Sequence, residues 1–443
     1  MSQDYYILKM LNMEDENIHF YKEFVNDEFI NGKRCLVFKA YLTYIPEYCP
    51  KCGSCYDEKI EKHGFKKSLI KIPAVSKLNT YLSLDKQRYH CHHCNKTFTC
   101  ITNIINYGCN ISNNTKHSIA ADLTKKRSEK DISIDNNVST NTVERITDSY
   151  FELDNKVYKN TLPQALSFDE FKSVKSADGA MSFQICNAKN GKIVDIVEDR
   201  KLNNLMKYFS RYSRQSRMNV KVIVIDMYTP YVSLIKVMFP DAKIVIDKFH
   251  LIELISRSLN KTRIKLMNKN KDNYNKLKRY WKNILKSRFE LNCSSWKKYP
   301  CFKELTTEQD IVDYLVSLDS ELEETYQVYQ DLLYALQNNN LSVLETTLNM
   351  KYNNISGYMK TSIKTLKGYL EYIKNTFTTN YHNGYVEGNN NFIKVLKRIA
   401  FGFRSFTRFK ARIMICKGLI TPKQKEVENL VWFNKICCEV NLL

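Results

Sequence analysis

Four cysteines form two C-x-x-C pairs, Cys49-Pro-Lys-Cys52 and Cys91-His-His-Cys94. Two such pairs supply the four thiolates that a tetrahedral Zn²⁺ ion binds. Apolar runs at residues 70–73 and 81–84 predict strands between the pairs, as in a zinc ribbon. A site closed by four sulfur ligands has no open position, which indicates one structural zinc ion. Buried free cysteines are the alternative, and four more side chains could ligate: Cys55, His90, His92 and His93.

Acidic side chains end or interrupt three short apolar runs. Asp169 lies within residues 165–171, and Asp226 ends a β-branched run of the kind found in buried parallel strands. Asp247 ends the next run of this kind. Between the first two runs, the Asn190-Gly191 pair predicts a hairpin turn.

The order of these elements is three strands, a helix, a strand, a helix, a strand and a helix, which matches an α/β ribonuclease H-like core. In that topology the first and fourth strands are neighbours, so we expect Asp169 and Asp226 side by side. Two adjacent carboxylates repel each other, and Mg²⁺ or Mn²⁺ stabilises both as anions because these ions prefer oxygen ligands. Asp247 could replace or assist Asp226. His250 could steady a phosphate or a metal-bound water, or it could cap the following helix.

A third acid, Glu387, begins a predicted helix whose later residues Lys394, Lys397 and Arg398 are basic. It could complete the metal site, or it could be an ion-pair partner of these cations. The helix leads into a segment in which basic residues, including Arg404 and Arg408, alternate with phenylalanines. Such a segment suits contacts with a nucleic-acid backbone. An amphipathic helix with its aromatic residues in the core is the alternative.

Residues 128–148 contain two short helical patterns around a polar turn, with Ser139 as an expected N-cap. Val143 and Ile146 would pack inward. The outward residues Thr140, Asn141 and Arg145 would then suit a recognition helix in a DNA major groove. An ordinary helical hairpin is the alternative.

The formal net charge of the 443-residue chain is +21, which suggests a polyanionic partner such as nucleic acid. A lysine-rich surface that maintains solubility is the alternative. No apolar run approaches the roughly 18 residues of a membrane-spanning helix. The first residues carry acids where a signal peptide would be basic. We therefore expect a cytoplasmic protein with reduced cysteines and no membrane partner.

Changes in pattern along the chain predict six segments. The expected order is an N-terminal segment at 1–48, a zinc-binding module at 49–109, a helix-turn-helix at 110–160, the first part of the core at 161–250, an α-helical insertion at 251–375, and the second part of the core with the glutamate helix and a basic C-terminal segment at 376–443.

This order of motifs resembles the DDE transposases of bacterial insertion sequences, specifically the ISL3 family, over essentially the whole chain. The most specific matches are the stretch from Asp226 to His250 and the stretch from Glu387 to Arg412 with its Gly402-Phe-Arg. The resemblance implies that Asp169, Asp226 and Glu387 are the catalytic triad and hold two Mg²⁺ or Mn²⁺ ions.

The resemblance also implies a function on double-stranded DNA. The protein would bind the terminal inverted repeats of an insertion sequence, cleave DNA strands and transfer them to target DNA, as a homodimer or larger assembly near the bacterial nucleoid. Two alternatives share the fold: a non-catalytic DNA-binding regulator derived from a transposase, and a metal-dependent nuclease without strand joining. The expected DNA-binding residues are Thr140, Asn141, Arg145, Lys394, Lys397, Arg398, Arg404 and Arg408.

Overall fold

The computed structural model describes residues 3–151 and 161–420. The chain divides into two compact units, one made of Met1–Asn155 with Ile393–Leu443 and the other of Lys156–Phe392. The end of the expected helix-turn-helix segment, at 152–160, and the end of the expected basic segment, at 421–443, lie outside the described residues.

The first unit contains a five-stranded sheet with the order β1-β2-β4-β3, in which β5 pairs with β4. The expected strands at 70–73 and 81–84 belong to the long antiparallel pair β3 and β4, which carries the second cysteine pair at its end. β2 pairs in parallel with β4, so the expected N-terminal segment and zinc-binding module share one sheet and one core. The elements are α1 (Gln3–Met10), β1 (Ile18–Ile30), β2 (Lys33–Leu42), β3 (Ile60–Val75), β4 (Leu78–Cys91) and β5 (Lys96–Thr99).

Three helices follow, α2 (Asn113–Leu123), α3 (Glu129–Asp135) and α4 (Thr140–Tyr150). Ser139 caps α4 as predicted, because its hydroxyl accepts a 3.2 Å hydrogen bond from the Thr142 N–H. Val143 and Ile146 are buried, also as predicted.

A fourth helix, α17 (Phe406–Cys416), packs on this group through Ile415, which joins the same apolar core as Ile119 and Val143. The buried guanidinium of Arg412 donates to the backbone carbonyls of Lys125 and Arg127 after α2. The structure thus groups α17 with the three-helix group, which covers its apolar face, whereas the segment 376–443 was predicted as the second part of the core with a basic C-terminal segment.

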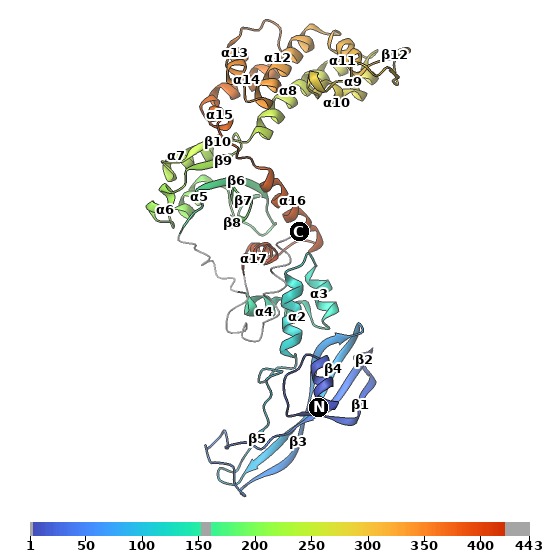
Figure 1. Ribbon diagram of the computed structural model, residues 1–443, viewed down its shortest axis with the longest axis vertical. Helices are drawn as coiled ribbons and strands as arrows, with labels where there is room; N and C mark the ends of the chain where they lie inside the picture. The colour runs from blue at the N-terminus through green and yellow to red at the C-terminus, as the bar shows by residue number, and fades with distance from the viewer. Residues whose placement is uncertain (1–2, 152–160, 421–443) are drawn as a thin grey trace. The chain divides into compact units, whose positions relative to one another are not determined.

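The second unit contains a five-stranded sheet with the order β10-β9-β6-β7-β8 (Figure 1). The strands β6, β7 and β8 are antiparallel, whereas β9 and β10 run parallel to β6. This order confirms the ribonuclease H-like fold. The strands are β6 (Ala165–Lys172), β7 (Met181–Asn187), β8 (Ile193–Val197), β9 (Val222–Ile225) and β10 (Lys243–Ile246).

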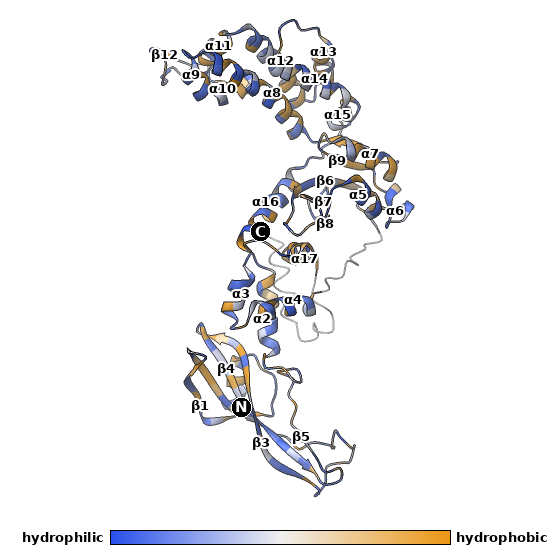
Figure 2. Cartoon of the chain, turned by 180° about the vertical axis from the view of Figure 1, so that it is seen from behind, coloured by the Kyte–Doolittle hydropathy of each residue, from blue (hydrophilic) through white to orange (hydrophobic). Residues whose placement is uncertain are grey.

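Helices pack on this sheet through large aromatic side chains, with Phe168, Phe183, Phe209 and Phe239 clustered in the core. Figure 2 shows the contrast between the apolar α7 and the hydrophilic α6. The helices beside the sheet are α5 (Leu202–Phe209), α6 (Arg214–Met218), α7 (Thr229–Met238) and α16 (Gly384–Ile399).

The expected insertion is helical, with one short two-stranded pair, β11 and β12, inside it. Its first helix, α8, begins directly after Asp247, and its last helix, α15, packs on β10. Its elements are α8 (Lys248–Lys269), α9 (Tyr274–Arg279), α10 (Trp281–Leu285), η1 (Arg288–Glu290), β11 (Lys297–Lys298), β12 (Leu305–Thr306), α11 (Glu308–Val316), α12 (Ser320–Gln337), α13 (Leu341–Asn349), α14 (Gly357–Gly368) and α15 (Leu370–Phe377). Among the described residues, no helix combines the length and the apolar character needed to cross a bilayer.

Candidate active site and metal centres

The ribonuclease H-like sheet brings Asp169 and Asp226 together. In the parallel pair β6 and β9, Ser167 lies opposite Val224, and each aspartate follows two residues later. Both carboxylates therefore lie level with each other where β9 ends, and the carboxyl ends of parallel strands form the edge at which open α/β sheets bind ligands. The two carboxylates are close enough to interact, because the negative charges of Asp169 and Glu170 both raise the pKa of Asp226.

Asp226 is held in an environment that disfavours an isolated charge. Burial, with smaller contributions from Glu170 and Asp169, raises its pKa to about 6, although His250 opposes this shift. Its buried Oδ1 atom has no hydrogen-bond partner among the residues that the structure describes. Burial also raises the pKa of Asp169. An orphaned carboxylate oxygen beside a second carboxylate fits a divalent cation with oxygen ligands.

The Asp169 carboxylate is oriented by two donors. Its Oδ1 accepts a 2.8 Å hydrogen bond from the Glu170 N–H, and its Oδ2 accepts a 2.8 Å hydrogen bond from the side-chain amide of Asn390. Asn390 lies on α16, three residues after Glu387, so the two side chains lie on the same face of that helix. Glu387 is exposed on this face, and it is the predicted third acid of the site.

The first turn of α16 is anchored to the sheet at Asn383. The backbone N–H of Asn383 donates a 3.1 Å hydrogen bond to Oδ1 of Asp247, and its side chain bonds to the Ser167 hydroxyl. One turn further on, the Asn389 amide donates a 2.8 Å hydrogen bond to the carbonyl of Gly191 in the hairpin between β7 and β8. These contacts fix the part of α16 that carries Glu387.

The two predicted accessory residues have different surroundings. Asp247 is buried, and its carboxylate binds the Asn383 backbone, which is a positioning contact. Asp247 also occupies the N-cap position of α8, so His250, in the first turn, is not the capping residue. The positive charge that His250 can carry lowers the pKa of both Asp169 and Asp226.

A further group beside the carboxylates was not predicted from the sequence. Glu170 accepts a 3.0 Å hydrogen bond from the Tyr231 hydroxyl and forms an ion pair with Arg200. The guanidinium of Arg200 also lies 5.0 Å from the centre of the Tyr228 ring. Arg200 therefore balances one of the three clustered acids. The adjacent acids Asp169 and Glu170 were the signal in the sequence for such a group, because two neighbouring acids in a buried strand need partners that stabilise their charges.

The four predicted zinc ligands converge in the first unit. The Sγ atoms of Cys49 and Cys94 are 3.9 Å apart, and those of Cys52 and Cys91 are 3.8 Å apart. Zn–S bonds of about 2.3 Å in a tetrahedron place sulfur atoms about 3.8 Å from one another. Hydrogen bonds with Ser54 lower the pKa of Cys52 to about 6, whereas burial raises the pKa of Cys94 to about 12, so the geometry and not the titration of the thiols identifies the site. The donor set therefore fits one structural Zn²⁺.

The predicted DNA-binding residues fall into two groups. Thr140, Asn141 and Arg145 are exposed on α4, as a recognition helix requires. The others lie on α16, on α17 or between them, and all except Lys397 and Arg408 are exposed. Arg408 is engaged within the protein, because it forms ion pairs with Glu144 and Asp148 on α4.

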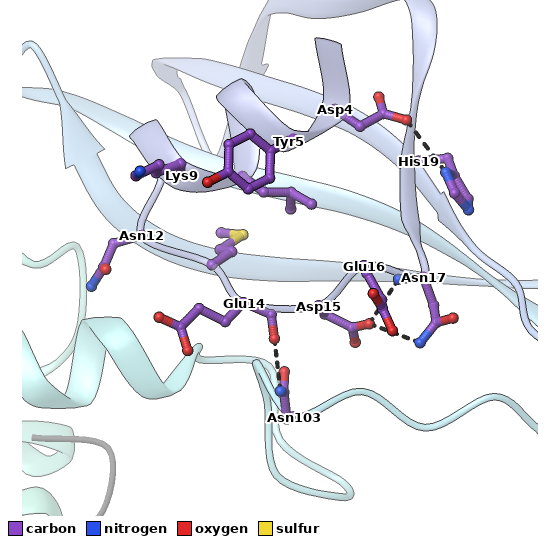
Figure 3. Close-up of a pocket in the computed structure, with 12 residues that line it drawn as sticks. Asp4, Tyr5, Lys9, Asn12, Glu14, Asp15, Glu16, Asn17, His19 and Asn103 are labelled. Carbon is purple, nitrogen blue, oxygen red and sulfur yellow. Dashed lines mark hydrogen bonds and ion pairs between the residues drawn. The ribbon is translucent and has the colours of Figure 1, made fainter. Parts of the chain in front are cut away.

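A cavity of about 790 Å³ lies between α1 and the segment that enters β1 (Figure 3). Acidic side chains line it, and the figure shows two of them, Asp4 and Asp15, in contact with neighbouring residues. Asp4 faces His19 at 3.3 Å, Asp15 accepts from the Asn17 N–H at 3.1 Å, and Asn103 donates to the Glu14 carbonyl at 2.7 Å. The contact between Asp4 and His19 ties the N-terminal helix to the sheet, and we assign the cavity no catalytic role.

Comparisons with known proteins agree with both centres. Residues 166–413 match the sequence model of the ISL3-type DDE family, described as a transposase. Residues 46–94 match the model described as the zinc-finger of transposase IS204/IS1001/IS1096/IS1165. A Lactococcus lactis subsp. lactis protein named "ATP-dependent protease" is 46% identical over 112 residues, which are 25% of this chain and 36% of that protein. The chain thus spans about a third of the length of that relative.

Proposed function

The chain belongs to the ISL3 family of DDE transposases, and from this premise we propose that it cleaves DNA strands at the terminal inverted repeats of an insertion sequence and transfers them to target DNA. One observation carries the proposal. Asp169 on β6 lies level with Asp226 at the end of the neighbouring strand β9, and the buried Oδ1 of Asp226 has no hydrogen-bond partner in the described part of the chain. A pair of clustered carboxylates with unused ligand capacity is suited to hold divalent cations for phosphoryl transfer.

Asp169, Asp226 and Glu387 would hold the two cations, and Mg²⁺ or Mn²⁺ suits these oxygen donors. When bound, such ions stabilise the charge on the attacking and leaving oxygens of an in-line displacement at phosphorus. Glu387 is the least constrained of the three acids, because it is exposed on α16 whereas Asp169 and Asp226, on β6 and directly after β9, are partly buried.

The other residues of the site hold this arrangement in place. Asn390 fixes the Asp169 carboxylate, and Asp247 with Ser167 fixes the start of the helix that carries Glu387. Water would cut the strand first, and the freed 3′-hydroxyl would then attack target DNA. Neither step forms a bond between the protein and DNA, so the reaction needs no nucleophilic serine or tyrosine.

Recognition of the element ends would fall to the first unit. The exposed Thr140, Asn141 and Arg145 on α4 would read the major groove, and the exposed cations of the C-terminal segment would contact phosphates. The zinc ion would hold the ribbon together. Since two ends must be joined to one target, the active complex would contain at least two copies of the chain, in the bacterial cytoplasm at the nucleoid.

The test uses the full-length protein and labelled duplex DNA that ends in the terminal repeat, with Mg²⁺ or Mn²⁺. We expect nicking at the repeat end and joined products with a second duplex. Cleavage without joining would favour a metal-dependent nuclease. Specific binding without cleavage, under conditions in which both cations are tested, would favour a DNA-binding regulator.

The name of the Lactococcus lactis relative does not extend to this chain. The match covers 25% of this chain, whereas the transposase family model covers the whole sheet and the glutamate helix. An ATP-dependent protease also needs a site for nucleotide phosphates. No two glycines in this sequence have the five-residue offset of the G-x-x-x-x-G-K-[ST] loop that cradles them.

A further inference from the structure

Histidines are concentrated beside the four-cysteine site. Four of the eight histidines of the chain, His63, His90, His92 and His93, lie on β3, on β4 or directly after β4. The structural zinc site is already complete with four sulfur atoms, so none of these imidazoles is needed there. The structural zinc site therefore does not explain why these histidines are concentrated here.

The strand geometry gathers two of these histidines with a carboxylate. Glu61 on β3 is the direct cross-strand partner of His90 on β4. His90 precedes Cys91 on β4, and because side chains alternate along a strand it lies on the opposite face from that buried cysteine, while His92 follows directly after the strand. Glu61 and His92 are exposed, and His90 is half-buried. The three side chains thus share the solvent-facing side of the ribbon.

The distances within this group would allow a metal ion to bind after only small movements of the side chains. One ligand atom from each of Glu61, His90 and His92 lies within 4.8 Å of the other two. Nε2 of His92 is 3.0 Å from Oε1 of Glu61, and the rings of His90 and His92 are 4.4 Å apart and perpendicular. Metal–ligand bonds of about 2.0–2.2 Å place neighbouring ligand atoms roughly 3–3.5 Å apart, so small rotamer changes suffice.

We propose that Glu61, His90 and His92 form a second divalent metal site, separate from the four-cysteine site and open to solvent. Two imidazoles and one carboxylate suit Zn²⁺, Ni²⁺ or Cu²⁺, whereas Mg²⁺ prefers oxygen ligands alone. Three protein ligands leave at least one position for water or for a fourth side chain. His63 is one such side chain, with its ring 5.7 Å from that of His90.

A metal ion bound at this site would cross-link β3 to the C-x-x-C segment that contains Cys91 and Cys94. The bound ion would exchange with solution more readily than the structural zinc, because its ligands are exposed and fewer. The second site would therefore respond to free metal concentration while the first stays filled.

The test measures zinc binding to full-length protein that already holds one zinc ion per chain, by isothermal titration with Zn²⁺. We expect one further, weaker equivalent in the wild type. Glu61→Gln should weaken it by roughly tenfold or more, and His90→Ala with His92→Ala should remove it. The matched control is His93→Ala. His93 contacts Asp57 at 2.8 Å and is not one of the three proposed ligands, so this variant should bind zinc like the wild type.

Each variant is checked for one retained structural zinc, which shows that the ribbon is folded. The proposal is overturned if the wild type binds no second equivalent, or if the double variant binds it as tightly as the wild type. An equal loss in His93→Ala and in the double variant would overturn the assignment of the ligands. Displacement of imidazole nitrogen resonances of His90 and His92, but not of His93, on addition of Zn²⁺ would support it independently.

Discussion

The side-chain amide of Asn390 on α16 donates a 2.8 Å hydrogen bond to Oδ2 of Asp169 on β6. β6 is the middle strand of the sheet, and α16 is the helix that carries Glu387. A single bond thus links the first acid of the predicted triad to the helix of the third. The position of Glu387 relative to the two aspartates depends on this contact and on the anchoring of Asn383.

Replacement of Asn390 by alanine tests that dependence. A hydrogen bond to a charged group contributes about 1.5–3 kcal/mol, so Asn390→Ala should slow strand cleavage by about 10- to 100-fold. The rate would be measured in single-turnover reactions with saturating DNA and Mg²⁺. The control is Asn391→Ala, because Asn391 is exposed on the same helix. Equal rates for the two variants would show that the bond has no part in positioning.

The four-cysteine site should retain one zinc ion per chain after exhaustive dialysis. Cys91→Ser removes a buried ligand and should reduce the zinc content well below one, with loss of amide protection in β3 and β4 because zinc binding contributes to folding. Metal analysis and hydrogen exchange measure the two effects. Cys55→Ser is the control, since Cys55 is an exposed cysteine outside the site. Zinc loss in both variants would contradict the ligand assignment.

Arg408 and Lys394 should differ in their contribution to DNA binding. Lys394 is exposed, so Lys394→Ala should reduce the slope of log affinity against log salt concentration by about one, as expected for a phosphate contact. Arg408 already forms ion pairs with Glu144 and Asp148, so Arg408→Ala should change the slope by less than half as much. Binding to repeat DNA at several salt concentrations measures both slopes, and a larger change for Arg408 would refute this distinction.

His117 on α2 should make the helical group sensitive to acid. Burial lowers the pKa of His117, and its ring packs 5.5 Å from that of Tyr150. The unfolded chain therefore takes up the proton first, and stability is lost as the pH falls from about 6.5 through the folded-state pKa. Protection factors of the α2 amides in the full-length chain should fall between pH 7.5 and 5.5. The fall should be smaller in His117→Gln, and equal falls would rule out this cause.

The strands of the catalytic sheet and the cysteine site could be predicted from short sequence patterns. The alternating and β-branched runs predicted β6 to β10 in the correct order, and their acids predicted the meeting of Asp169 and Asp226. The spacing of the cysteines predicted their convergence. In each case the deciding information lay within a few residues of the motif.

Contacts between distant segments were not predictable in this way. The parallel pairing of β2 with β4 joins strands separated by β3, and no local signal specifies it. The packing of α17 on α2 to α4 depends on which apolar surface covers Ile415. The roles of Asn383, Asn389 and Asn390 follow from partners at Asp247, Gly191 and Asp169, each more than a hundred residues away along the chain.

We propose that Asp226, and not Asp247, works with Asp169 at the catalytic centre. The buried Asp247 carboxylate accepts a backbone hydrogen bond from Asn383, and an asparagine side-chain oxygen can accept the same bond. We therefore expect Asp247→Asn to retain strand joining within about tenfold of the wild type.

The most direct measurement is strand transfer by Asp226→Asn and Asp247→Asn on labelled terminal-repeat DNA with Mg²⁺, after circular dichroism has shown that both variants are folded. Asp226→Asn replaces a charged ligand of the cations with a neutral amide, so joining should fall by about 10³-fold or more. Joining that survives in Asp226→Asn but is abolished in Asp247→Asn would contradict the account.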